Sequence, residues 1–213
     1  ALPVDECIQM AVAAAARPVV ISDSGDNPTA GGVGDVPYLL ERLIAHGAPD
    51  AIYASIADST AVAVCHAAGP GANVRLSLGG KLDPVHGQPL EISGVVKTVV
   101  TVPWPLYGPE AGRAQNRQCV VQIGGVQVVI TEQRTPFHRL DDFRKLGIEP
   151  AEHALIVVKV GYLVPELKAL AATALLALSP GAVDQDITRR PYQRIRRPMY
   201  PFDPDMNWEP AVG

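Results

Sequence analysis

Residue types that could do chemistry concentrate in one loop. Residues 22–35 read SDSGDNPTAGGVGD, which places aspartates and an asparagine among several glycines. The carboxylates could orient a substrate amine, and backbone N–H groups bared by glycine at a helix start could hold a carboxylate or phosphate. The alternative is a long surface loop that uses glycine and asparagine for its turns. The candidate substrate-binding residues of the loop are Asp23, Asp26, Asn27, Gly31 and Gly32.

Two other segments offer polar candidates. Lys159 ends an apolar run, so it could face a site, or it could mark the point where a strand reaches water. Residues 79–87 place Lys81 and His86, with Asp83 between them, in a glycine-rich stretch. These side chains could form the polar rim of a site. Turn chemistry more strongly favours a simple connection between strands.

No sequence motif supplies a complete metal site or a hydrolytic triad. The five histidines are scattered, without HxH or HExxH spacing, and the three cysteines lie far apart without a CxxC pair. GxSxG and Walker-type glycine patterns are also absent. We therefore expect this chain alone to bind no structural or catalytic zinc.

The composition excludes several classes of partner. A formal net charge of −4 and only 5% aromatic residues argue against nucleic-acid binding. No apolar run reaches the length of a transmembrane helix, roughly 18 residues or more, so we expect no membrane insertion. Three isolated cysteines are typical of a reducing compartment, and we expect a cytoplasmic protein.

The elements that must position these residues alternate between strand and helix over the first third of the chain. Hydrophobic spacing predicts helices at 4–16, 35–46 and 59–68, with Asp35 capping the second. Short runs at 19–23 and 51–56 are apolar on both faces, as in parallel strands. This rhythm predicts an α/β layer whose loop at 22–35 leaves the carboxyl edge of the sheet, where such sheets bind ligands.

The middle of the chain predicts an antiparallel portion. Alternation indicates strands at 74–78 and 90–102, and a hairpin at 119–131 turns at two adjacent glycines. Residues 103–116 are expected to form a loop. The prediction is a β-rich insertion of about four strands between residues 74 and 131.

The last third returns to the α/β rhythm. We expect a helix near 140–146, an apolar strand at 154–160 and an Ala/Leu helix at 165–178 that begins with proline. The proline- and arginine-rich residues 180–213 are expected to be an extended tail packed on the body. The predicted fold is therefore one α/β domain over 1–213, with a mixed sheet, flanking helices and an inserted antiparallel portion.

Four segments in order resemble a known family. The chain resembles the C-terminal domain of microcystinase C-like proteins in the following blocks: Pro18–Pro28 with the glycines after it, Gly79–Lys81 with Asp83, Pro84 and His86, Val158–Lys159, and Ser179–Gly181 with Arg196–Pro201. These blocks span nearly the whole chain.

The resemblance implies a two-domain, zinc-dependent metallopeptidase whose N-terminal domain supplies the metal ligands. It further implies that this chain completes the cleft for a small peptide or amide substrate and is not active alone. Many members carry a serine and a His-Phe-Arg run after the lysine that matches Lys159, whereas this chain has Val160–Pro165. The substrate contacts of those members therefore do not carry over.

Two other functions remain compatible with the residues. The same loop could bind a small anion or phosphate without chemistry, or the chain could be a structural domain that holds a homo-oligomer together.

Overall fold

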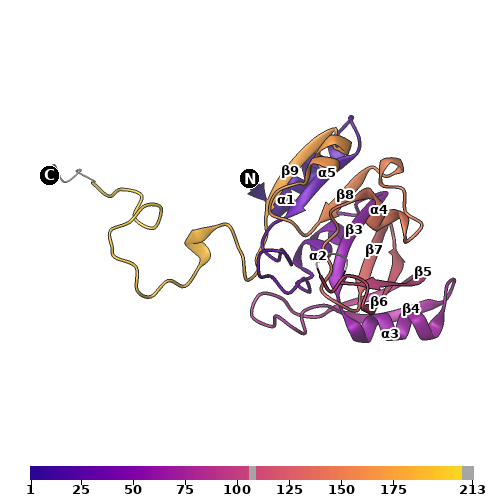
Figure 1. Cartoon of the computed structure of the whole chain (residues 1–213). Coiled ribbons are helices and arrows are strands. Elements are labelled where there is room, and N and C mark those ends of the chain that lie inside the picture. Colours follow the sequence, from indigo (N-terminus) through magenta and orange to yellow (C-terminus); the bar gives the residue numbers. More distant parts are fainter. Residues whose placement is uncertain (106–108, 208–213) are drawn as a thin grey trace.

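The computed structural model describes residues 1–105 and 109–207, in which the strands form one mixed sheet (Figure 1). The strand order is β1-β9-β2-β8-β3-β7-β6-β5-β4. The strands are β1 (Leu2–Pro3), β2 (Val19–Asp23), β3 (Ala51–Ala57), β4 (Asn73–Leu78), β5 (Leu90–Trp104), β6 (Ala114–Ile123), β7 (Val126–Thr131), β8 (Leu155–Val158) and β9 (Thr173–Leu178).

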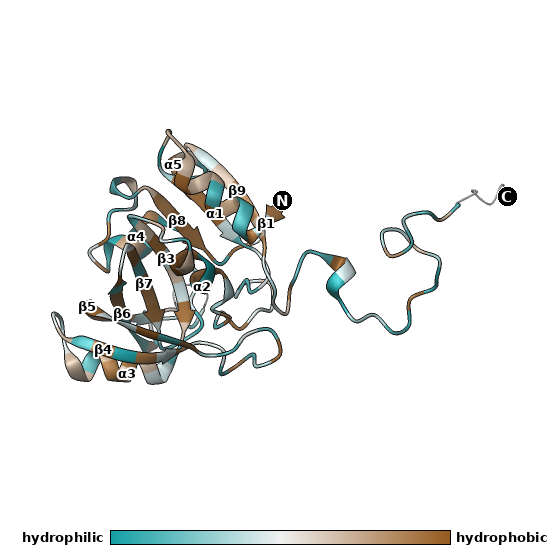
Figure 2. Ribbon diagram, turned by 180° about the vertical axis from the view of Figure 1, so that it is seen from behind, coloured by the Kyte–Doolittle hydropathy of each residue, from teal (hydrophilic) through white to brown (hydrophobic). Residues whose placement is uncertain are grey.

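One half of the sheet is parallel and buried on both faces. Strands β1, β9, β2, β8, β3 and β7 pair in parallel in that order. Every residue of β2, β3 and β8 is buried, which explains why their sequences are mostly apolar. Figure 2 shows hydrophobic colours along β3, β7 and β8. The expected parallel strands after residues 18 and 50 are confirmed.

The other half is antiparallel and contains β4, β5, β6 and the outer side of β7. Burial alternates residue by residue along β4, as its sequence predicts. The predicted loop at 103–116 is too long, because β5 continues to Trp104 and β6 begins at Ala114; residues 106–108 lie outside the described residues. The antiparallel strands also extend the parallel sheet, because β7 pairs directly with β3.

Helices cover both faces of the sheet and enclose two hydrophobic clusters. On one face lie α1 (Val4–Ala13), α2 (Tyr38–Ala45) and α3 (Ser59–Ala68). On the other lie α4 (Leu140–Arg144) and α5 (Pro165–Leu170), together with the side chain of Phe137. The described residues also form two short 3-10 helices, η1 (Pro150–Glu152) and η2 (Ile187–Arg189).

The predicted helix at 165–178 is wrong in its second half. Helix α5 ends at Leu170, and the Ala/Leu-rich residues 173–178 form β9. This strand lies between β1 and β2 and pairs with both. Pairing on two sides outweighs the helical preference of alanine and leucine, which amounts to only ~0.5 kcal/mol per residue.

Smaller differences occur at helix ends. Helix α1 stops at Ala13 instead of residue 16, and α2 begins at Tyr38 instead of residue 35. Asp35 does not cap α2, because its carboxylate accepts hydrogen bonds from a different loop. Asp58 caps α3 by accepting a hydrogen bond from the Ala61 N–H.

The C-terminal segment divides into an attached part and a projecting part. Ser179 and Val183 bond to Gly25 in the loop after β2. Most of the described tail after η2 runs away from the body (Figure 1), contrary to the prediction that residues 180–213 pack on it, although Arg190 and Tyr192 still line a cavity together with His86. Residues 208–213 lie outside the described residues. No helix in the described part of the chain is long and apolar enough to cross a membrane.

Candidate functional site

The carboxyl edge of the parallel strands gathers the loops that carry the predicted site residues. The loops after β2, β3, β7, β8 and β9 all begin at this edge. Residues 79–89 join them, because the Gly79 N–H donates to Asp58 and the Gly80 N–H donates to the Asp35 carbonyl. The topology thus unites segments that are far apart in sequence.

Beneath these loops lies a buried ionic network centred on Lys159. Its Nζ donates to Asp23 Oδ2 at 3.3 Å, to Asp26 Oδ2 at 3.1 Å and to the Val36 carbonyl at 2.7 Å. The exposed fractions of Lys159, Asp23 and Asp26 are only 3%, 2% and 0%. One ammonium group therefore links the ends of β2 and β8 to the approach to α2.

Neutral donors complete the hydrogen bonding of the two carboxylates. The Tyr53 hydroxyl donates to Asp23 Oδ2 at 2.7 Å, and the Ser179 hydroxyl donates to Asp23 Oδ1. Asp26 accepts two backbone bonds of 2.8 Å from the Gly34 and Val36 N–H groups. Hydrogen-bonded, paired charges of this kind are the form in which ions are tolerated inside proteins.

The electrostatics of the network favour a charged lysine. Burial by itself lowers the pKa of Lys159, but the charges and hydrogen bonds of Asp23 and Asp26 outweigh it and raise that pKa above its usual value. Burial, followed by the charge of Asp23, raises the pKa of Tyr53 well above its usual value. Tyr53 therefore remains a neutral donor and Lys159 a permanent cation at physiological pH.

The structure buries three of the residues that the sequence predicts to bind substrate. The sequence places Asp23, Asp26 and Lys159 on the wall of a cleft, whereas the structure places them inside the protein. Their bonds hold the loop in shape, and none of the three presents a polar atom at the surface in this conformation.

The remaining predicted residues of the loop lie nearer its tip. Asn27 is buried, and its Oδ1 accepts hydrogen bonds from the N–H and hydroxyl of Thr29, so it forms a local turn. Gly31 is exposed with φ of +111°, a conformation that favours glycine. Gly32 is buried, and a Cβ atom there would lie 2.6 Å from the Asp26 backbone. Only residues 29–31 of the loop are solvent-exposed.

Asp35 is a second buried acid beside the network. Its Oδ2 accepts hydrogen bonds from the Lys81 and Leu82 N–H groups, whereas its Oδ1 has no hydrogen-bond partner. Burial raises the pKa of Asp35 despite those two backbone bonds, and the charge of Asp26 adds to the rise. This side chain anchors residues 79–89 on the start of the α2 region.

A cavity of about 560 Å³ opens at the carboxyl ends of β3 and β7. Lys81 and Arg134 are its basic residues, and the start of α3 forms another part of its wall. Lys81 Nζ donates to Asp58 Oδ2 at 2.7 Å. Arg134 is exposed and makes one 3.4 Å bond to the Gly32 carbonyl, with no carboxylate partner among the described residues. The cavity therefore presents a free guanidinium group beside the loop tip.

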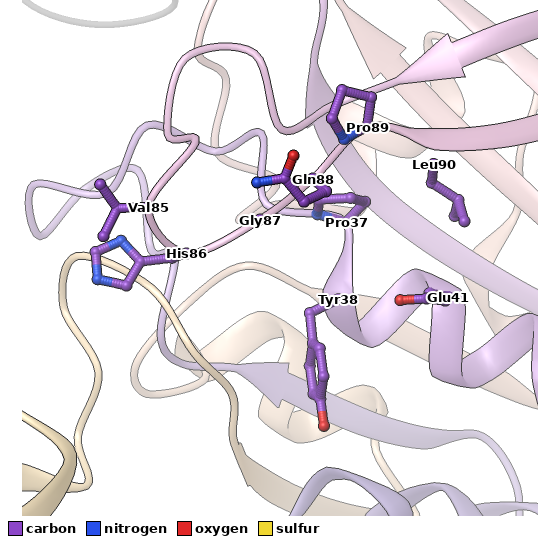
Figure 3. Close-up of a pocket in the computed structure, with 9 residues that line it drawn as sticks. All are labelled: Pro37, Tyr38, Glu41, Val85, His86, Gly87, Gln88, Pro89 and Leu90. Carbon is purple, nitrogen blue, oxygen red and sulfur yellow. The ribbon is translucent and has the colours of Figure 1, made fainter.

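His86 belongs to the same segment, residues 79–89, but lines a different pocket from that of Lys81. Its Nδ1 is 2.7 Å from Asp83 Oδ2, and its side chain is 35% exposed. Asp83 Oδ1 also accepts hydrogen bonds from the Val85 and His86 N–H groups, which fixes the turn. Figure 3 shows His86 at a groove of about 300 Å³ that also contains Tyr38 from α2.

Sequence reasoning missed three side chains at this edge. Arg134 follows β7 by three residues, so the rule that led to Asp23 would also have indicated it. Ser179 follows β9, which was hidden inside the predicted helix. Tyr53 is in the middle of an apolar strand, and no local pattern marks it as a hydrogen-bond donor.

The side chains of the described residues do not form a site for a resident metal ion. Among the described residues, no group of three or more histidine, cysteine, aspartate or glutamate side chains is arranged to hold one. The acid-paired histidines are separate: His46 with Asp5, His86 with Asp83, and His153 with Asp50.

Comparison with known proteins gives this arrangement a family. A family model described as MlrC C-terminus matches residues 21–194. The chain belongs to this family. The resemblance to microcystinase C-like proteins is thereby confirmed.

Two relatives of the chain are longer proteins. Microcystinase C from Sphingomonas sp. is 30% identical over 206 residues, which are 92% of this chain and 38% of that protein. A crystal structure of a protein from Mesorhizobium sp. BNC1, proposed to be a metallopeptidase, has a TM-score of 0.77 and 22% identity and covers 98% of this chain and 42% of that one. The fold is shared with that structure, and the chain spans less than half the length of either relative.

Proposed function

We propose that this chain is the C-terminal domain of a metal-dependent amide or peptide hydrolase. The observation that carries the proposal is the match to the MlrC C-terminal family over residues 21–194, together with the similarity to a relative named microcystinase C. Because the chain spans 38% of that relative, the remaining length is enough for a separate domain. In this proposal the other domain holds the metal.

The metal would be zinc, and its ligands would lie outside this chain. When bound, such an ion polarises the scissile carbonyl and activates water. The described residues offer no three-ligand set, so no chemical step is assigned to metal ligands of this chain. In this proposal the chain contributes by binding and positioning the substrate.

The carboxyl edge forms one wall of the substrate cleft. Lys81 and Arg134 face the cavity beside the loop tip, where their positive charges can hold the carbonyl oxygens or carboxylates of a peptide. The Lys159 network keeps that tip in a fixed shape, because it ties both ends of the loop to the sheet. Fixed donors stabilise developing charge better than mobile ones, since they need no reorganisation.

The alternative function, binding of a small anion without chemistry, can be tested at the same cavity. Without chemistry, the same cavity would bind phosphate through Arg134 and stabilise the fold. Phosphate at a hundredfold its dissociation constant would add about 2.7 kcal/mol to the free energy of unfolding.

Hydrolysis by the full-length polypeptide tests the proposal. The protein is incubated with linear peptides before and after chelation, and mass spectrometry identifies the products. We expect amide cleavage that chelation abolishes and that zinc restores. Cleavage that is unaffected by chelation, or no cleavage of any peptide by the zinc-loaded protein, would refute the proposed activity.

A further inference from the structure

A second cavity lies where the C-terminal segment crosses residues 79–89. It has a volume of about 270 Å³, and its walls include His86, Arg189, Arg190 and Tyr192. It adjoins the groove of Figure 3, because His86 lines both. Neither the buried network nor the cavity beside Arg134 uses these residues.

The charges in this cavity leave one cation without a partner. Arg189 donates to Asp184 Oδ1 at 2.7 Å and lies 3.6 Å from Asp186, so its charge is neutralised. Arg190 donates through Nε and Nη2 to the Asp184 carbonyl at 2.9 and 2.6 Å. Within the described ranges, no carboxylate lies within ion-pair distance of Arg190, which is half-buried. A half-buried cation of this kind is well suited to an anionic ligand, because its Nη1 remains available.

His86 also lines this cavity, and Asp83 fixes the orientation of its ring. Asp83 accepts a hydrogen bond from Nδ1 at 2.7 Å, which places the proton on that nitrogen in the neutral ring. Nε2 has no partner among the described residues, and in this tautomer it accepts a hydrogen bond. Tyr192 adds an aromatic ring, 46% exposed, whose position is supported by an edge contact with Phe202.

We propose that this cavity binds the C-terminal residue of a peptide, with Arg190 on its free carboxylate and His86 Nε2 on its N–H group. The inference rests on the proposed function for the identity of the ligand as a peptide. Tyr192 provides a surface for an apolar side chain of that residue. The cavity would give the hydrolase a preference for substrates or products with a free chain end close to the cleft.

A binding experiment on the 213-residue chain tests this without metal or turnover. The probes are N-acetyl-phenylalanine, its primary amide and inorganic phosphate, followed by calorimetry and by the ring signals of His86 in NMR. We expect saturable binding of the acid. The amide should bind at least about tenfold more weakly, a difference of about 1.4 kcal/mol in binding free energy. The His86 signals should move only with the acid.

Variants locate the site. Arg190→Gln should weaken binding of the acid about tenfold and remove the preference over the amide. Arg194→Gln changes an exposed arginine of the same tail, outside the cavity, and should bind as the wild type does. Equal melting temperatures for both variants would show that folding is unaffected.

Three results would overturn the proposal: no saturable binding of the acid, equal affinity for acid and amide, or wild-type affinity in Arg190→Gln. Tighter, Arg190-dependent binding of phosphate would also overturn it, by assigning the cavity to phosphate. Failure of metal-dependent hydrolysis in the full-length protein, with acid binding intact, would refute the proposed function alone.

Discussion

Replacing Lys159 with methionine removes the ammonium group that neutralises Asp23 and Asp26 inside the protein. The two carboxylates keep their hydroxyl and backbone donors, but they lose their counter-charge, and the Val36 carbonyl loses its 2.7 Å donor. Breaking a buried ion pair from one side costs about 3–5 kcal/mol. For a chain of this length, 1 kcal/mol shifts the melting temperature by about 2–4 °C, so we expect a fall of roughly 6–20 °C.

The charge of Lys159 does not change over the ordinary pH range. In wild type the pKa of Lys159 is raised, so its stabilising charge is constant below the ordinary lysine pKa of about 10.4. The part of the free energy of unfolding that this charge supplies should therefore be the same at about pH 5 as at about pH 8.

Urea denaturation followed by circular dichroism measures both effects. Lys97→Met provides the matched control, since it removes an exposed lysine from β5. Combining Lys159→Met with Asp26→Asn should destabilise by less than the sum of the single variants, because the two residues share one interaction. A loss below about 1 kcal/mol for Lys159→Met at pH 7 would mean that the network does not hold the loop.

Other changes test neighbouring parts of the structure. Asp35→Asn should gain stability relative to wild type as the pH rises from about 4 to about 8, because burial raises the pKa of Asp35 and the amide cannot ionise; parallel denaturation curves that differ equally at both pH values would contradict this. Leu40→Ala should cost about 2–5 kcal/mol, since Leu40 is fully buried on α2, and a calorimetric loss under about 1 kcal/mol would place its side chain elsewhere. Gly32→Ala should cost about 1–3 kcal/mol in the same assay, as its Cβ would meet the backbone of Asp26, and wild-type stability would disprove that contact. Metal analysis of the purified 213-residue chain should find no stoichiometric zinc, and one equivalent held by a single protomer would refute our assignment of the ligands to another domain.

The parallel strands could be predicted because their sequences are apolar on both faces. The short apolar runs of β2 and β8 are typical of strands that are buried on both faces, and polar residues follow them. Hydrophobic spacing also predicted α3 and the hairpin of β6 and β7. Strand β9 could not be predicted in this way, because alanine and leucine favour a helix locally and only its two neighbours in the sheet make it a strand.

The candidate site shows the same division between local and long-range information. The sequence placed Asp23, Asp26 and Lys159 at or just after the ends of predicted apolar strands. It could not show that Lys159 bonds to both aspartates, because this depends on β2 and β8 being adjacent in the sheet. The burial of all three charged side chains was also not indicated by the sequence pattern. The free charge of Arg134 was likewise invisible without knowing which acids lie nearby.

The central claim is that the carboxyl edge of this domain forms a wall of the substrate cleft, and Arg134→Gln in the full-length protein tests it most directly. Arg134 is exposed, so its replacement should leave the melting temperature unchanged. We predict that kcat/KM for peptide hydrolysis falls about tenfold or more, a loss of about 1.4 kcal/mol of transition-state stabilisation. Arg75→Gln, on the exposed face of β4, should keep wild-type kcat/KM. Unchanged kcat/KM in Arg134→Gln would contradict the placement of the cleft at this edge.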